Sequence, residues 1–153
     1  MINPIKQIYS FNKDGGLLDK GYDDCLEASF QVEEALEGFS NLSDLGKLFH
    51  LSPEESTPKQ LSRDIVAVAH NRNTTLSDVD RLDKACDAVV FAVGSIAKLG
   101  LNPQQITQAL SIVMEANTAK LLGPGRDEFG KLRKPTDFQP PEPKLQALLD
   151  ERN

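Results

Sequence analysis

The chain has 153 residues, of which 39% are hydrophobic and 26% are charged, and its formal net charge is −6. This length suits one domain with a single buried core, and the composition is typical of a soluble globular protein. The acidic balance argues against a duplex-DNA binder, whose affinity would come from a basic surface, but a divalent cation can still join acidic protein to a phosphate-bearing ligand.

No apolar run approaches the length that crosses a bilayer, and the first residues lack the apolar stretch of a signal peptide. We therefore expect a cytoplasmic protein with no membrane partner. The two cysteines, Cys25 and Cys86, have no zinc-binding or CxxC spacing and lie among apolar residues, so we expect buried free thiols. The two histidines, His50 and His70, match no metal-ligand pattern.

The first half of the chain begins with an expected irregular lead-in over residues 1–20, where Gly15-Gly16 marks a break. A helical pattern then runs from about residue 22 to 39, with an apolar residue at every third or fourth position. A short helical piece is expected at 43–50. Thr57-Pro58 combines a capping hydroxyl with a proline at the first helical position, and it begins a helix that reaches about residue 70.

The second half of the chain predicts two long helices. The first runs from about residue 77 to 98 and is followed by Gly100, in the position that a left-handed cap prefers. The second begins at Asn102-Pro103, where Gln105 completes a capping box, and it reaches about residue 122.

Residues 123–143 are rich in glycine, proline and charge, so we expect an extended loop there, followed by a short helix at about 144–150. No segment alternates convincingly with a period of two, so no sheet is expected. The sequence therefore predicts an all-α fold, a helical bundle of about four main helices forming a single domain over residues 1–153.

Acidic side chains interrupt the apolar stripes of two predicted helices. Glu33, Glu34 and Glu37 fall within a sector about 100° wide on the first long helix. Asp83 and Asp87 lie four residues apart, along the flank of the stripe on the 77–98 helix. If these helices pack side by side, the carboxylates converge and need a cation, and oxygen-only ligands favour Mg²⁺ or Mn²⁺ over zinc. The alternative is that both runs are solvated helix faces.

Basic and amide side chains gather near the C-terminal end. Asn117 and Lys120 are three residues apart and project from one helix face, and Lys131 and Lys134 follow in the loop. Lysine acts on phosphate as a point charge, and asparagine can donate hydrogen bonds to a sugar or base. These residues are suited to hold a polyphosphate, although a solvated loop with lysines near a helix C-terminus is an equally simple interpretation.

The order of these motifs resembles the MazG-like and phosphoribosyl-ATP pyrophosphohydrolase-like superfamily of all-α nucleoside triphosphate pyrophosphohydrolases. The resemblance covers about residues 22–141. Its motifs are the EExxE run Glu33–Glu37, the aspartates of the 77–98 helix, Ala116-Asn117 with Lys120, Gly130-Lys131, Lys134-Pro135 and Pro140-Pro141.

The resemblance implies a role for each of these residues. Glu34, Glu37 and Asp87 would be Mg²⁺ ligands, and Glu33 would be a further ligand or the base that acts on water. The family commonly has an ExxD motif on the second helix. Here Lys84 stands three residues before Asp87, and Asp83 would substitute from the neighbouring position.

We therefore expect a Mg²⁺-dependent enzyme that cleaves the α–β phosphoanhydride of a nucleoside triphosphate or related nucleotide, giving a monophosphate and pyrophosphate. The resemblance also implies a homodimer or homotetramer. The alternative is a non-catalytic helical module that binds nucleotide or protein. Lys84 favours this alternative because it stands where the family commonly has an acidic residue. A helix-turn-helix DNA-binding protein is disfavoured, because the chain is acidic and has no basic recognition helix. No aromatic box identifies the base, and Phe138 and Tyr22 are candidates for its recognition.

Overall fold

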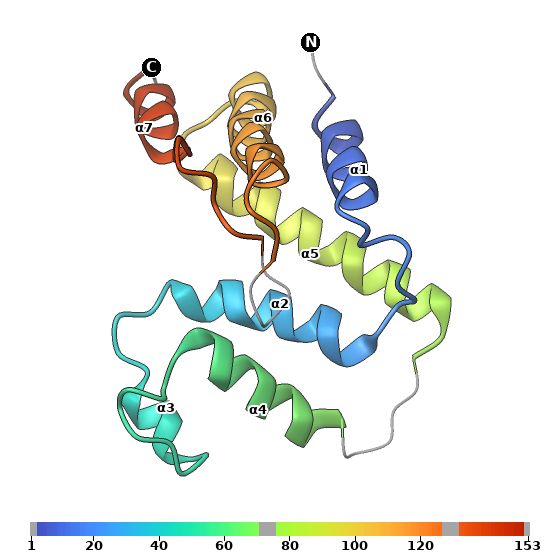
Figure 1. Cartoon of the computed structure of the whole chain (residues 1–153), viewed down its shortest axis with the longest axis vertical. Helices are drawn as coiled ribbons and strands as arrows, with labels where there is room; N and C mark the ends of the chain where they lie inside the picture. The colour runs from blue at the N-terminus through green and yellow to red at the C-terminus, as the bar shows by residue number, and fades with distance from the viewer. Residues whose placement is uncertain (1–2, 71–75, 127–131, 152–153) are drawn as a thin grey trace. The chain divides into compact units, whose positions relative to one another are not determined.

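The computed structural model describes residues 3–70, 76–126 and 132–151, and within these ranges the chain is all-α and has no strand (Figure 1). This confirms the predicted fold class. The helices of the described ranges are α1 (Pro4–Asp14), α2 (Asp24–Glu37), α3 (Ser43–Lys47), α4 (Pro58–His70), α5 (Asp78–Lys98), α6 (Pro103–Lys120) and α7 (Glu142–Asp150).

The chain divides into two compact units. One comprises Met1–Lys20 with Asp78–Asn153 and holds α1, α5, α6 and α7. The other is Gly21–Ser77 and holds α2, α3 and α4. We refer to them as the split unit and the central unit. The expectation of a single domain stays a prediction.

In the central unit, α2 and α4 lie side by side (Figure 1). Leu61 of α4 is 0% exposed, and Val66, one and a half turns further along the same helix, is also buried. Thr57 caps this helix as expected: its Oγ1 accepts a hydrogen bond from the Gln60 N–H at 3.2 Å. The apolar side of α4 thus forms the core of this unit.

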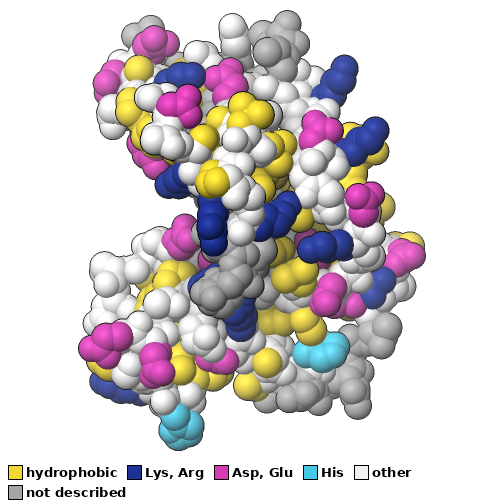
Figure 2. Space-filling model, in the orientation of Figure 1, with side chains coloured by type: hydrophobic (Ala, Val, Ile, Leu, Met, Phe, Trp, Pro, Cys, Tyr) yellow, Lys and Arg dark blue, Asp and Glu magenta, His cyan; other side chains and the backbone are white. Residues whose placement is uncertain are grey.

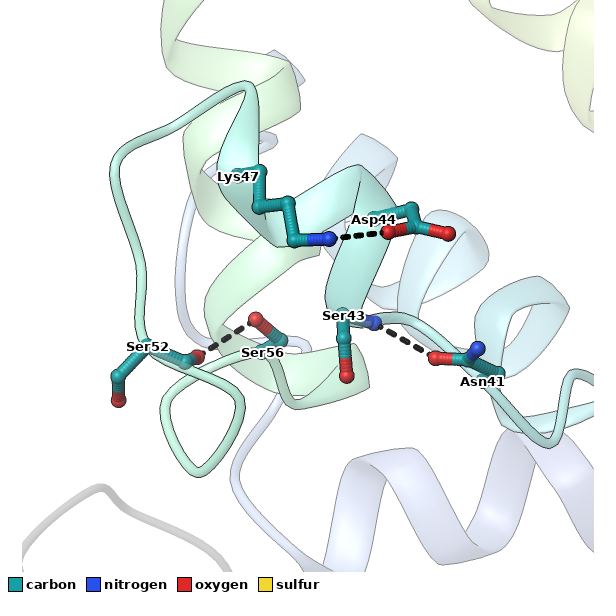
Figure 3. A network of polar contacts seen from close by, with 6 residues as sticks. All are labelled: Asn41, Ser43, Asp44, Lys47, Ser52 and Ser56. Atoms are coloured by element: carbon teal, nitrogen blue, oxygen red, sulfur yellow. Dashed lines mark hydrogen bonds and ion pairs between the residues drawn. The ribbon is translucent and has the colours of Figure 1, made fainter.

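Short-range polar contacts fix the segment around α3 (Figure 3). The Ser43 N–H donates to Oδ1 of Asn41 at 3.1 Å, and the Ser56 hydroxyl donates to the Ser52 carbonyl at 2.7 Å. Buried Gly46 packs directly on the Ser56 side chain, where there is no room for a Cβ atom. The chain can therefore pass this closely only with glycine at position 46.

In the split unit, α1, α5 and α7 all contact α6. Ala109 and Ile112 of α6 form a buried cluster with Leu148 of α7. Asn102 and Gln105 make both hydrogen bonds of the predicted capping box, each at 3.0 Å. The left-handed glycine expected before this helix is also confirmed, with Gly100 at φ 88°.

The prediction of an irregular lead-in over residues 1–20 is wrong, because α1 occupies Pro4–Asp14. Asn3 caps this helix by accepting hydrogen bonds from the N–H groups of Ile5 and Lys6, and proline stands at its first position. The later part of the segment fits the expected break, since Gly16 adopts φ 67°.

The apolar stripe of α5 lies at the surface rather than in a core. Val79 is 77% exposed, Leu82 66% and Val89 56%. Cys86 on the same helix is exposed and Cys25 is half-buried; both are free thiols, so the predicted burial of the cysteines is wrong in part. Figure 2 shows hydrophobic side chains at the surface on the face that it presents.

The described helices include none that is, alone, long and apolar enough to cross a membrane. α5 and α6 meet that test only together, as a pair bent by 111°.

Candidate functional site

Two of the predicted phosphate-binding side chains meet on the last turn of α6. The Lys120 ammonium donates a hydrogen bond to Oδ1 of Asn117 at 2.8 Å, across the spacing of three residues that places both on one helix face. Both side chains are half-buried. This bond orients the amide so that its NH₂ group is available as a donor.

The loop after α6 brings a second lysine to the same place. The ammonium nitrogens of Lys120 and Lys134 lie 5.7 Å and 5.1 Å from the centroid of the Phe138 ring. Both distances are within the range of cation–π attraction. Asn117, Lys120, Lys134 and Phe138 are called the basic cluster below; Lys131 lies outside the described residues.

Glycines allow the loop to return to α6. Gly123 lies so close to the Arg133 carbonyl that a Cβ atom would overlap it. Gly125 adopts φ 94°, and its carbonyl accepts a hydrogen bond from the Arg133 N–H at 2.8 Å. Beside this bond, an isolated antiparallel bridge joins Arg126 to Leu132. The described parts of 123–143 otherwise form the expected loop, up to the start of α7.

A pocket of about 380 Å³ opens between the C-terminal half of α6 and the segment that leads into α7. Ile112, Ala116 and Ala119 line it from α6, and Phe138 and Pro141 line it from the opposite side. At its edge the Lys144 ammonium lies 3.1 Å from Oε2 of Glu115. No sequence motif indicates this pocket, because it depends on how the loop folds back onto α6.

The acidic residues of α2 lie on its more exposed side. Glu34 and Glu37 are exposed and Glu33 is half-buried. Leu26 and Phe30, also exposed, precede them on that side. The half-buried residues of the other side are Cys25, Ala28, Ser29, Val32 and Leu36.

The predicted stripe of α2 therefore divides into two sides. Cys25 and Ser29 line a second pocket, of about 450 Å³, together with Val66 and His70 of α4, so the half-buried side packs on α4. Leu26, at the border of the two sides, also lines this pocket. The carboxylates flank the exposed apolar side instead.

Asp83 and Asp87 of α5 are both exposed, one turn apart along the exposed stripe. In the described ranges, no hydrogen bond or ion pair involves the side chains of these two aspartates or of Glu33, Glu34 and Glu37.

The described residues contain no group of three or more His, Cys, Asp or Glu side chains placed to hold a metal ion. The acidic residues of α2 belong to the central unit and those of α5 to the split unit. The meeting of the two acidic faces therefore stays a prediction, whereas Asn117, Lys120 and Lys134 are brought together.

Chemically, the basic cluster can receive an anion with an aromatic neighbour, and the two acidic faces offer oxygen ligands to a hard cation. Comparisons with protein-family models, with curated proteins and with solved structures found no match for this chain.

Proposed function

We propose that the protein is a Mg²⁺-dependent nucleotide pyrophosphohydrolase, which cleaves the α–β phosphoanhydride of a nucleoside triphosphate or related nucleotide. The products are a nucleoside monophosphate and pyrophosphate. The observation that carries the proposal is the basic cluster, in which Asn117, Lys120 and Lys134 gather at Phe138 in an otherwise acidic chain.

The basic cluster would hold the phosphates. Lys120 and Lys134, together with Lys131 from the same loop, would offset the charge that develops on the pyrophosphate leaving group. The Asn117 amide, oriented by Lys120, would donate a hydrogen bond to the sugar or to a phosphate oxygen. These groups bind and position the substrate.

The acidic residues would hold the metal. Glu34, Glu37, Asp83 and Asp87 would be the Mg²⁺ ligands, because a set of carboxylates without His or Cys fits a hard ion. Mn²⁺ would fit the same donors. When bound, the ion would neutralise phosphate charge and lower the pKa of a coordinated water. Glu33 would accept the proton of the water that attacks the α phosphorus.

The proposal extends to assembly. The exposed stripe of α5, with Val79, Leu82 and Val89 at its surface, would be buried in a homodimer or homotetramer. If instead about four main helices of one chain form a bundle, packing within that chain would bury the same stripe.

Product analysis tests the proposal. The protein is incubated with a panel of ribo- and deoxyribonucleoside triphosphates and Mg²⁺, and the products are identified by ³¹P NMR. We expect monophosphate and pyrophosphate in equal amounts from at least one nucleotide, and a loss of about a hundredfold or more in kcat for Glu37→Gln. The matched control is Glu54→Gln, which neutralises an exposed glutamate outside the proposed site and should retain activity. Release of orthophosphate alone, or no turnover of any nucleotide, would contradict the proposal.

The second candidate is a non-catalytic helical module that binds nucleotide or protein. Lys84 favours it, because a lysine stands on α5 where the resemblance leads us to expect an acidic ligand. This candidate predicts that the protein binds nucleotide without hydrolysing it. It also predicts that any stabilisation by Mg²⁺ is the same in wild type and in Glu37→Ala.

A further inference from the structure

We infer that the pocket between α6 and the segment leading into α7, called the α6 pocket below, receives the base of the nucleotide. The inference rests on the proposed function for the identity of the ligand, and it places Phe138, a candidate for base recognition in the sequence, in a defined pocket. It follows from the shape of the pocket, the polar groups at its edge and its connection to the basic cluster.

The shape suits a planar ring. Ile112, Ala116 and Ala119 of α6 line the pocket with apolar side chains, and the two alanines are small. The opposite side carries the Phe138 ring and Pro141. Two facing apolar walls favour insertion of an aromatic ring, and a volume of about 380 Å³ lies within the range of small-molecule sites.

Polar groups stand at the edge of the pocket, where the rim of a base would lie. Asp137 and Gln139 line it, and the Gln139 amide donates to the Asp137 carbonyl at 3.4 Å. The Glu115–Lys144 ion pair lies on the α6 and α7 side. Amide and carboxylate side chains recognise bases by hydrogen bonds to their edges, so the pocket offers both stacking surfaces and edge partners.

Phe138 joins the pocket to the basic cluster. Its ring lines the α6 pocket, and the ammonium groups of Lys120 and Lys134 lie over the same ring. A ligand that fills both places needs an aromatic ring at one end and negative charge at the other. A nucleotide has this chemistry, whereas an inorganic polyphosphate would occupy the cations only and an apolar molecule the pocket only.

Methyl NMR of the wild-type protein is the first test. The full chain is labelled at the alanine and isoleucine methyl groups and titrated, with Mg²⁺ present, with each nucleoside 5′-monophosphate and separately with pyrophosphate. We expect saturable shifts of the Ile112, Ala116 and Ala119 methyl signals with at least one monophosphate, and no such shifts with pyrophosphate. Ala147 on α7, which does not line the pocket, is the internal control. Unchanged pocket methyl signals with every monophosphate would overturn the inference.

Filling the pocket is the second test. Ala119→Leu should raise the dissociation constant for the monophosphate about tenfold and leave that for pyrophosphate within about twofold. Thr118→Leu introduces the same side chain at the preceding position, which is exposed and does not line the pocket, and it should change neither dissociation constant. Equal losses for both ligands in Ala119→Leu, or no loss for either, would contradict a base-binding pocket.

The two proposals fail in different ways. Saturable pocket shifts with a monophosphate but no hydrolysis of any triphosphate would leave the base pocket standing and overturn the enzyme. Hydrolysis with an unchanged KM in Ala119→Leu would leave the enzyme standing and overturn the pocket.

Discussion

Two positive charges are held against one aromatic ring in the basic cluster. The ammonium groups of Lys120 and Lys134 are each attracted to the Phe138 ring, yet they repel one another. A bound phosphate would offset that repulsion. Two cations beside one aromatic ring are therefore suited to attract a phosphate.

Removing one of these charges should weaken catalysis. Lys134→Gln is expected to lower kcat/KM for the nucleotide about tenfold, because one cation no longer offsets charge on the leaving group. Steady-state kinetics measures the effect, and Lys13→Gln on α1 is the matched control. A Lys134→Gln enzyme with the kinetics of the Lys13→Gln control would exclude a role in phosphate binding.

A second residue-level effect concerns pH. The hydrogen bond and charge of Lys47, whose Nζ lies 2.6 Å from Oδ1 of Asp44, lower the pKa of Asp44 from its ordinary value of 3.8 (Figure 3). Backbone and side-chain hydrogen bonds from Ser52 likewise lower the pKa of Glu55 from 4.5. Because each pKa is lower in the folded chain, each ionised group stabilises the fold when the pH lies above the group's ordinary pKa. This contribution is lost as the pH falls through the folded-state pKa.

The melting temperature should report this dependence. The difference between wild type and Asp44→Asn is expected to be small, because the pair is exposed, but largest near pH 7 and smaller as the pH falls below 3.8. In a Lys47→Met background the pH-dependent part of the difference should disappear. Persistence of the same pH dependence without Lys47 would show that another group causes it.

At the scale of single elements, local signals predicted most helix starts. The Asn102-Pro103 start of α6 and the Thr57-Pro58 start of α4 are confirmed, because a cap and a first-turn proline act within a few residues. The Asn3-Pro4 start of α1 carries the same signal, and the Gly15-Gly16 break lies only after the helix ends. This helix was predictable.

Apolar periodicity was a weaker guide, because it tells which residues share a helix face but not what covers that face. The stripe of α5 is regular, yet Val79 and Leu82 are exposed. On α2, the single stripe expected from periodicity divides into a half-buried side and an exposed side that carries the carboxylates. Which side packs on a neighbour depends on contacts distant in sequence, and these leave no periodic signal.

The segment around α3 depends on one close contact, between Gly46 and Ser56. Gly46→Ala should lower the free energy of unfolding by about 1–3 kcal/mol, because the added methyl group overlaps the Ser56 side chain. Urea denaturation followed by circular dichroism measures it. Gly38→Ala is the matched control, since its Cβ would meet only the Ala35 carbonyl, at an ordinary 3.5 Å, and should cause little loss.

A double-mutant cycle identifies the cause. Ser56→Gly should recover part of the stability lost in Gly46→Ala, because it removes the overlapping atoms. Equal stability of Gly46→Ala and Gly38→Ala would contradict the close contact.

At the scale of the whole molecule, the candidate site was predictable where it is local. The spacing of Asn117 and Lys120 placed them on one helix face, and they bond to each other. The contact of Lys120 with Phe138 requires the loop to return past Gly123, which composition alone does not specify. The acidic residues were placed on helix faces by their spacing, but their proposed sharing of an ion depends on helices that lie in different units.

The affinity for Mg²⁺ tests most directly whether the two acidic helices share one ion. It is measured by isothermal titration calorimetry for wild type, Glu37→Gln, Asp87→Asn and the double variant. A shared ion predicts that each single variant loses most of the affinity and that the double variant loses little more, so the losses are strongly non-additive. Losses that simply add, or Mg²⁺ affinity unchanged in both single variants, would contradict a common metal site on the two acidic helices.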